Sequence, residues 1–289
     1  IRRYSIIHVQ KNQTRSSNLY ELSRFSSLMK IGIAGIPIDY KKKGIIEGIK
    51  GIKELGLDSL EYQLGRGITL KPEKAEQIGI CGKDYNVEIS LHAPYYLNFS
   101  VRDETLIKWM GALHQTTRLA ALMNASITVL HPGWVVKSLD RETCLRNIIS
   151  NLQDFTGLGI ETMGRINAMG HFQEVLDICS RTGHRPVLDF AHIHSLNPLK
   201  SVHDFLTIFK EVESRLGHQN HFHTHFTAVE VRNGEEKKHL PIEEGEPHFS
   251  LLAQAVREQG YNTTVICESP ELDRDAVKMK KIYSSCSNQ

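Results

Sequence analysis

Histidine and carboxylate side chains recur along this chain at the ends of short apolar segments. Segments that end in such residues follow one another at intervals of 28 to 45 residues. Imidazole and carboxylate groups without thiolates suit zinc or manganese at a catalytic site. Together with one histidine from a later polar segment, the residues are His92, His131, Glu161, Asp189, His192, His223, His239 and Glu268. Because so many ligands exceed the needs of one ion, the pattern predicts two or three divalent ions. Such clusters, with ions about 4 Å apart, are typical of phosphate-ester hydrolysis.

The stretch from 221 to 247 supplies the later histidine. It begins as a short alternating segment with His223 and His225, and it continues as a polar segment that contains Asn233-Gly234 and His239. We interpret it as a strand end followed by a long polar loop, which would place an imidazole near the strand ends. A solvated loop with incidental histidines is the alternative.

Each candidate residue also has a purely structural explanation. His92 or His131 could be a hydrogen-bonded core imidazole, Glu161 and Glu268 could form buried ion pairs, and Asp189 could cap the following turn. Few lysine or arginine residues stand at the same strand ends to neutralise the carboxylates. Since an unpaired buried carboxylate costs several kcal/mol, the joint pattern favours metal ions as partners.

A fold in which strand ends converge is needed to bring these side chains together. Short apolar runs alternate with segments of helical periodicity, such as 104–123, 205–216 and 249–259. This alternation predicts a single-domain α/β fold, the (β/α)8 TIM barrel, whose active-site side chains project from the C-terminal ends of the strands. An open doubly wound sheet would favour a glycine-rich turn after the first strand, and residues 32–35 lack that spacing. The predicted strands are 30–35, 59–64, 87–93, 126–131, 158–163, 186–192, 221–226 and 264–269.

The composition is that of a globular protein with a substantial core. Of 289 residues, 40% are hydrophobic and 24% are charged. A run of about 18 apolar residues is lacking, which excludes a membrane-spanning helix. Five scattered cysteines without a CxxC pair favour a reducing compartment such as the cytoplasm, and they argue against a disulfide framework.

Residues 1–28 differ from the rest of the chain. They lack hydrophobic periodicity, are rich in serine and arginine, and carry a formal charge of +4, which leaves −2 for the remainder. A nucleic-acid partner would therefore have to meet a local basic surface. We expect 1–28 to be a disordered leader, a transit peptide or an upstream extension that is dispensable for the fold, and 29–289 to form the barrel domain.

Seven motifs, taken in order, resemble the endonuclease IV family of apurinic/apyrimidinic endonucleases. They are HAPYYLNFS (92–100), LHPG (130–133), GIETMG (159–164), LDFAH (188–192), FHTHF (222–226), KHLPIEEGEP (238–247) and CESP (267–270). The resemblance extends from Met29 to about Ile282. It implies a zinc-dependent barrel that cleaves double-stranded DNA on the 5′ side of an abasic site, in whichever compartment holds that DNA, and we expect a monomer.

The resemblance also implies roles for individual residues. His92 and His131 match ligands of a first ion, and Glu161 matches the carboxylate that bridges it to a second. Further ligands of the second ion are matched by Asp189, His223 and Glu268, and ligands of the third by His192 and His239. Glu161 and Glu268 would lie beside the reacting water, and Tyr95 matches an aromatic at the DNA-facing rim.

Two further features concern the third ion and the DNA. The family has an aspartate two residues before the loop histidine, where this chain has Lys237. The third ion is therefore expected to bind weakly or to be absent unless Glu236 or a water replaces that aspartate.

In the segment Gly65-Arg66-Gly67, Arg66 is a candidate contact to the DNA backbone, with an exposed turn arginine as the alternative.

Two other functions fit parts of the pattern. A sugar isomerase or epimerase of the related barrel superfamily needs one metal ion, which Glu161, Asp189, His223 and Glu268 would supply. It does not need the other histidines to converge on further ions. A non-catalytic barrel with structural metal is the second alternative.

Overall fold

The computed structural model describes residues 28–286, and these form a closed barrel of eight parallel strands. Around the barrel the strands follow the order β1-β12-β9-β8-β6-β4-β3-β2. They are β1 (Met29–Ala34), β2 (Ser59–Gln63), β3 (Glu88–His92), β4 (Thr128–Leu130), β6 (Leu158–Glu161), β8 (Arg185–Asp189), β9 (Phe222–Phe226) and β12 (Thr263–Cys267). The predicted (β/α)8 barrel is thus confirmed. The expected leader lies, except for Leu28, outside the described residues.

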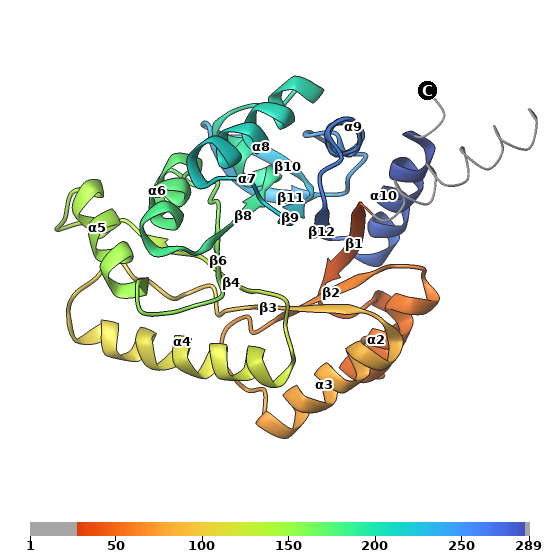
Figure 1. Cartoon of the computed structure of the whole chain (residues 1–289), viewed down its shortest axis with the longest axis horizontal. Helices are drawn as coiled ribbons and strands as arrows, with labels where there is room; N and C mark the ends of the chain where they lie inside the picture. Colours follow the sequence, from red (N-terminus) through yellow and green to blue (C-terminus); the bar gives the residue numbers. More distant parts are fainter. Residues whose placement is uncertain (1–27, 287–289) are drawn as a thin grey trace, which may run out of the picture.

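Helices surround the barrel on its outer side (Figure 1). Two of the three predicted from periodicity begin at side-chain caps: the Asp103 side chain accepts a hydrogen bond from Thr105 N, and Ser201 forms a capping box with Asp204. The helices are α2 (Ile45–Glu54), α3 (Pro72–Tyr85), α4 (Glu104–Leu122), α5 (Arg141–Leu152), α6 (Phe172–Thr182), α7 (Phe190–Leu196), α8 (Val202–Leu216), α9 (Phe249–Gln259) and α10 (Asp273–Ser285), with a 3-10 helix η1 at Ile38–Tyr40. Among residues 28–286, none is long and apolar enough to cross a membrane.

The two faces of the barrel strands carry different side chains. On β2, Leu60 packs into the core beneath the helices, whereas Glu61 points into the barrel and meets Ser90 of β3 and His223 of β9. This alternation follows from the two-residue period of a strand. The barrel interior is therefore polar along β2, β3 and β9, and it leads to the strand ends where the candidate ligands gather.

Two elements near those ends differ from the prediction. The predicted strand 186–192 ends at Asp189, and α7 begins immediately after it. The Asp189 Oδ1 accepts a hydrogen bond from His192 N at 2.8 Å, so the predicted capping role of Asp189 is also present.

The predicted polar loop after β9 is a β-hairpin. Its strands are β10 (Ala228–Arg232) and β11 (Glu235–Leu240), and the turn residues Asn233 and Gly234 both have positive φ, 55° and 76°. An Asn-Gly pair strongly favours such a turn. The charged composition of this segment concealed the strands, because neither has a continuous buried face. A second small pair, β5 (Gly133–Trp134) with β7 (Ala168–Met169), also lies beyond the barrel strands.

Candidate metal centre

The first group of candidate ligands joins the ends of three neighbouring strands. His92 ends β3, His131 follows β4, and Glu161 ends β6. Nε2 of His92 lies 2.9 Å from Glu161 Oε2, and Nε2 of His131 lies 3.2 Å from the same oxygen. His92 Nδ1 lies 2.7 Å from the Ala93 carbonyl, so an N–H at Nδ1 would leave the Nε2 lone pair facing Glu161. The structure brings together the three residues that the sequence analysis assigned to one ion.

Glu161 also belongs to a second group, with Asp189, His225 and Glu268. Nδ1 of His225 lies 3.5 Å from Glu161 Oε1, 3.5 Å from Glu268 Oε1 and 4.0 Å from Asp189 Oδ2. All but Glu268 are buried. Since Oε2 of Glu161 faces the first group and Oε1 faces the second, this carboxylate lies between two sets of candidate ligands.

His225 stands in that second group, where His223 was predicted. Both histidines face the barrel interior, because alternate residues of a strand share a face. His225 is nearer the C-terminal end of β9 and pairs with Asp189, whereas His223 pairs with Val187 one layer below. His223 Nε2 meets Glu61 Oε2 at 2.9 Å instead.

A third group forms between α7 and the hairpin. Its members are His192, Glu236 and His239. Glu236 Oε2 lies 3.3 Å from His192 Nε2, and Oε1 lies 3.6 Å from His239 Nε2. The other ring nitrogens meet backbone carbonyls: His192 Nδ1 is 2.8 Å from Thr162 O, and His239 Nδ1 is 3.1 Å from Glu268 O.

A β-bulge at Lys237 explains how Glu236 reaches this group. Glu236 pairs with Val231 and Lys238 pairs with Glu230, so Lys237 has no partner on β10. Residues three apart, such as Glu236 and His239, face opposite sides of a regular strand. The extra residue of a bulge between them brings both to the same side. Glu236 therefore faces the same side of the hairpin as His239, and the Lys237 side chain is exposed to solvent.

The hairpin is fixed over the centre by contacts with the segment after β6. Glu236 N donates to Gly164 O at 3.0 Å, and Ile166 N donates to Glu235 Oε2 at 3.1 Å. A Cβ on Gly164 would lie 2.8 Å from the His192 Cα, so glycine permits this segment to pack against α7. The segment after β6 thus supports the third group, whose members come from α7 and the hairpin.

Opposite charges balance within the centre. Burial alone would raise the pKa of Glu161, but the neighbouring His131 and His225 hold it well below its usual range. Burial would likewise lower the pKa of His92, yet its hydrogen bond to Glu161 raises it to about 9. For Glu236, the effect of burial is outweighed by His192, whose hydrogen bond lowers the carboxyl pKa to about 2. Protons on the imidazoles therefore offset the buried carboxylates.

The same donor set fits divalent cations. Among the described residues, Asp189 Oδ2, His131 Nδ1 and both ring nitrogens of His225 are buried without a hydrogen-bond partner. Buried polar atoms normally have partners. Imidazole and carboxylate ligands without thiolate suit zinc or manganese, and such ions bind by displacing the ligands' protons.

The two candidate DNA contacts lie beside each other on the surface. Tyr95 N donates to Gly65 O at 3.4 Å, which joins the segment after β3 to the turn that carries Arg66. The Tyr95 side chain is 43% exposed, and Arg66 is also exposed. Both follow C-terminal ends of barrel strands, on the side of the barrel that carries the three ligand groups.

Comparison with known proteins identifies the family. The model of the xylose isomerase-like TIM barrel family matches residues 49–283, and the chain belongs to this family. It is 28% identical over 273 residues to an uncharacterized protein of Methanocaldococcus jannaschii, in a match that covers 89% of this chain and 97% of that protein. The family is consistent with the resemblance to endonuclease IV.

Solved structures share the fold at lower identity. Endonuclease IV from Thermus thermophilus is 17% identical, with a TM-score of 0.67 over 88% of this chain and 98% of that chain. A D-tagatose 3-epimerase-like protein is 23% identical, with a TM-score of 0.68 over 90% of this chain and 98% of that chain. At these identities the similarity establishes the barrel, and the choice between activities depends on the side chains.

Besides His225, Glu61 is a residue of the site that was not predicted from the sequence. It lies within the predicted strand 59–64, and its carboxylate contacts both His223 and His225. A glutamate at an inward position of an apolar strand was the available signal, since a buried carboxylate requires partners.

Proposed function

We propose that this protein is a metal-dependent phosphodiesterase that hydrolyses the DNA backbone on the 5′ side of abasic sites. The observation that carries the proposal is the sharing of one buried carboxylate, Glu161, between two ligand groups, with a third group beside them. Ions in these groups would supply Lewis-acid activation of water and stabilise negative charge at the phosphate. Zinc is the expected metal, and manganese has the same ligand preferences here.

The chain's own residues would divide the work. Glu161 and Glu268 lie at the strand ends, where their carboxylates could hold a reacting water in position. Glu236 and His239 extend the centre toward the hairpin, while the exposed Arg66 could pair with a backbone phosphate. The exposed ring of Tyr95 could stack where a base is missing.

Selectivity for abasic DNA would come from deformation. A duplex without one base unstacks at lower cost, so a lesion could enter the centre while an intact nucleotide could not. This requires no reading of base edges, and it is compatible with the near-neutral net charge of +2.

Incubation with a duplex that contains one abasic site tests the proposal. We expect incision on the 5′ side of the lesion, loss of incision with a chelator, and recovery after addition of zinc. A duplex of the same sequence without the lesion is the control. Incision of both duplexes at equal rates, or of neither by the zinc-loaded protein, contradicts the proposal.

A single-metal sugar epimerase is the second candidate. Glu161, Asp189, His225 and Glu268 alone could hold one ion, and the fold is also that of a D-tagatose 3-epimerase-like protein. That activity leaves His92, His131 and the third group unexplained. Metal content separates the two: one tightly bound ion per chain favours the epimerase, whereas two or three favour the phosphodiesterase.

A further inference from the structure

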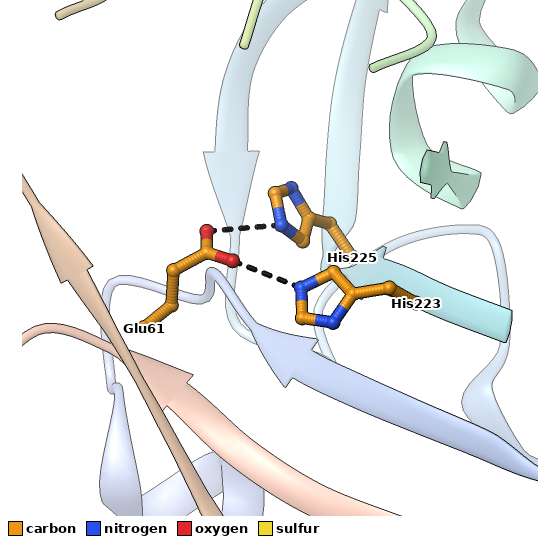
Figure 2. A group of neighbouring side chains, drawn as sticks. All are labelled: Glu61, His223 and His225. Carbon is orange, nitrogen blue, oxygen red and sulfur yellow. Dashed lines mark hydrogen bonds and ion pairs between the residues drawn. The ribbon is translucent and has the colours of Figure 1, made fainter. Parts of the chain in front are cut away.

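A polar cluster inside the barrel joins the metal centre at His225, and its other two members, Glu61 and His223, have no part in the chemistry proposed above. Glu61 on β2 points toward His223 and His225 on β9 (Figure 2), and all three side chains are buried. Oε2 of Glu61 lies 2.9 Å from His223 Nε2, and Oε1 lies 3.0 Å from His225 Nε2. In the sheet, β1 and β12 separate β2 from β9, so these contacts cross the barrel interior.

The Glu61 carboxylate is already surrounded by donors. Ser90 Oγ donates to Oε2 at 2.9 Å, Gln63 Nε2 donates to Oε1 at 3.1 Å, and the two imidazoles complete the set. A carboxylate offers about four lone-pair sites, and three hydrogen bonds together with the contact from His225 Nε2 surround this one. We therefore interpret Glu61 as an ionised carboxylate that holds its neighbours in place, and not as a further metal ligand.

His225 links this cluster to the second ligand group. Its Nε2 faces Glu61, while its Nδ1 faces Glu161 and Glu268 at 3.5 Å. Neither ring nitrogen has an aligned hydrogen bond. A neutral imidazole carries one N–H and one lone pair, and a carboxylate next to Nε2 favours the N–H at that position. The Nδ1 lone pair then faces the metal centre.

The other histidines are oriented differently. His92 and His239 each place Nδ1 near a backbone carbonyl and turn Nε2 toward the centre. His192 turns Nε2 toward Glu236, and its Nδ1 lies 2.8 Å from Thr162 O and 3.3 Å from Glu161 Oε1. For His225 the relation is reversed, and the outer partner is a carboxylate. A carboxylate in this position fixes the tautomer and increases the basicity of the ligating nitrogen.

We propose that Glu61 is a positioning residue of the metal centre, which holds His225 with its N–H at Nε2 and its Nδ1 lone pair on the ion shared with Asp189 and Glu268. This inference rests on the metal centre of the proposed function and is independent of the substrate. Glu61 itself would not touch the ion, and His223 and Ser90 contact Oε2, the carboxylate oxygen that does not face His225.

Glu61→Gln tests the role, because the amide keeps the shape and removes the charge. We expect zinc affinity for one ion per chain to fall by roughly 10–100-fold, measured by competition with a chromophoric chelator. Affinity for the ion at His92 and His131 should be unchanged. Ser90→Ala is the matched control: it removes a hydrogen bond to the same carboxylate without touching His225, and zinc affinity should stay within about threefold of wild type. Melting temperatures of the metal-free variants measure any general effect on folding.

Wild-type affinity in Glu61→Gln, or an equal loss in Ser90→Ala, overturns the proposal. A second measurement needs no variant of Glu61. In the zinc-loaded wild-type protein with 15N-labelled histidine, NMR should show His225 protonated at Nε2 and coordinated through Nδ1, with its signals assigned from their loss in His225→Gln. Coordination through Nε2 would contradict the proposal even if Glu61→Gln did not fold.

These experiments use zinc without DNA, so their outcome is separate from that of the cleavage assay. If the protein binds zinc as expected but cuts no abasic duplex, the proposed substrate is wrong and the role of Glu61 stands. If the protein cuts abasic DNA and Glu61→Gln binds zinc normally, the role of Glu61 is wrong. Failure of the wild-type protein to bind zinc would overturn both.

Discussion

The carboxylate of Glu236, on the hairpin, lies 3.3 Å from Nε2 of His192 on α7. The contact joins two segments that the sequence analysis described incorrectly, one as loop and one as strand. It completes a third ligand group despite Lys237 at the position where an acidic residue was expected. The bulge at Lys237 makes this contact possible, since it turns Glu236 and His239 to the same face.

Glu236→Gln and His239→Ala should each lower the affinity for one ion by at least about tenfold, because each removes a candidate ligand. The ions that depend on Glu161 should be retained, so cleavage should fall less than in Glu161→Gln. Metal analysis after dialysis against a weak chelator provides the measurement. Lys237→Ala is the matched control, since that side chain is exposed at the bulge. An unchanged ion count in both ligand variants would disprove the third site.

Glu161→Gln should reduce cleavage by at least about 10²-fold while the fold is retained. The substitution removes the one carboxylate that faces both of the first two groups, at 2.9 Å from His92 and 3.5 Å from His225. Initial rates on an abasic duplex and circular dichroism of the same sample are the measurements. A near-normal rate with full metal content would exclude Glu161 from the mechanism.

Removal of metal should lower the melting temperature. An ion present at 100 times its Kd stabilises the folded state by about 2.7 kcal/mol, which corresponds to roughly 5–10 °C for a domain of this size. Thermal melts of the zinc-loaded protein with and without EDTA measure the shift. It should be smaller in Glu161→Gln, because that variant binds fewer ions. The same melting temperature for the zinc-loaded and the metal-free protein would argue against metal ions held by the buried groups.

The two exposed residues beside the centre should affect DNA binding in different ways. Arg66→Ala should weaken binding to any duplex. It should also reduce the slope of log affinity against log salt concentration by about one, as expected for the loss of one phosphate contact. Tyr95→Ala should weaken binding to abasic duplex more than to intact duplex, because stacking at the gap depends on the lesion. Binding isotherms at several salt concentrations distinguish the two effects.

Arg181→Ala serves as the control for Arg66→Ala. Arg181 is exposed near the C-terminal end of α6, which lies at the opposite end of the barrel from the ligand groups. An equal loss of affinity in Arg181→Ala would show that the effect of Arg66 is one of net charge.

The barrel and the first ligand group were predictable because their signals are regular. Apolar runs at the spacing of βα units define the strands, and His92, His131 and Glu161 stand at or just after their C-terminal ends. Convergence of these ends is a property of any such barrel.

Other features of the site depend on how the strands pair with one another, and a single sequence does not reveal that pairing. His223 and His225 share a face, and only the depth of β9 in the barrel decides which one reaches Asp189. Glu61 reaches β9 across the barrel interior, which no local pattern reveals. In the hairpin, the Asn233-Gly234 pair was a usable signal for a turn. The position of the bulge follows from the pairing with β10.

Cleavage and metal content measured on the same zinc-loaded sample test the central claim most directly. The substrate is a duplex with one abasic site, and the products are compared with size markers for incision on either side of the lesion. The account predicts two or three bound ions per chain and chelator-sensitive incision on the 5′ side. A protein that binds a single ion and leaves the abasic duplex intact would contradict it.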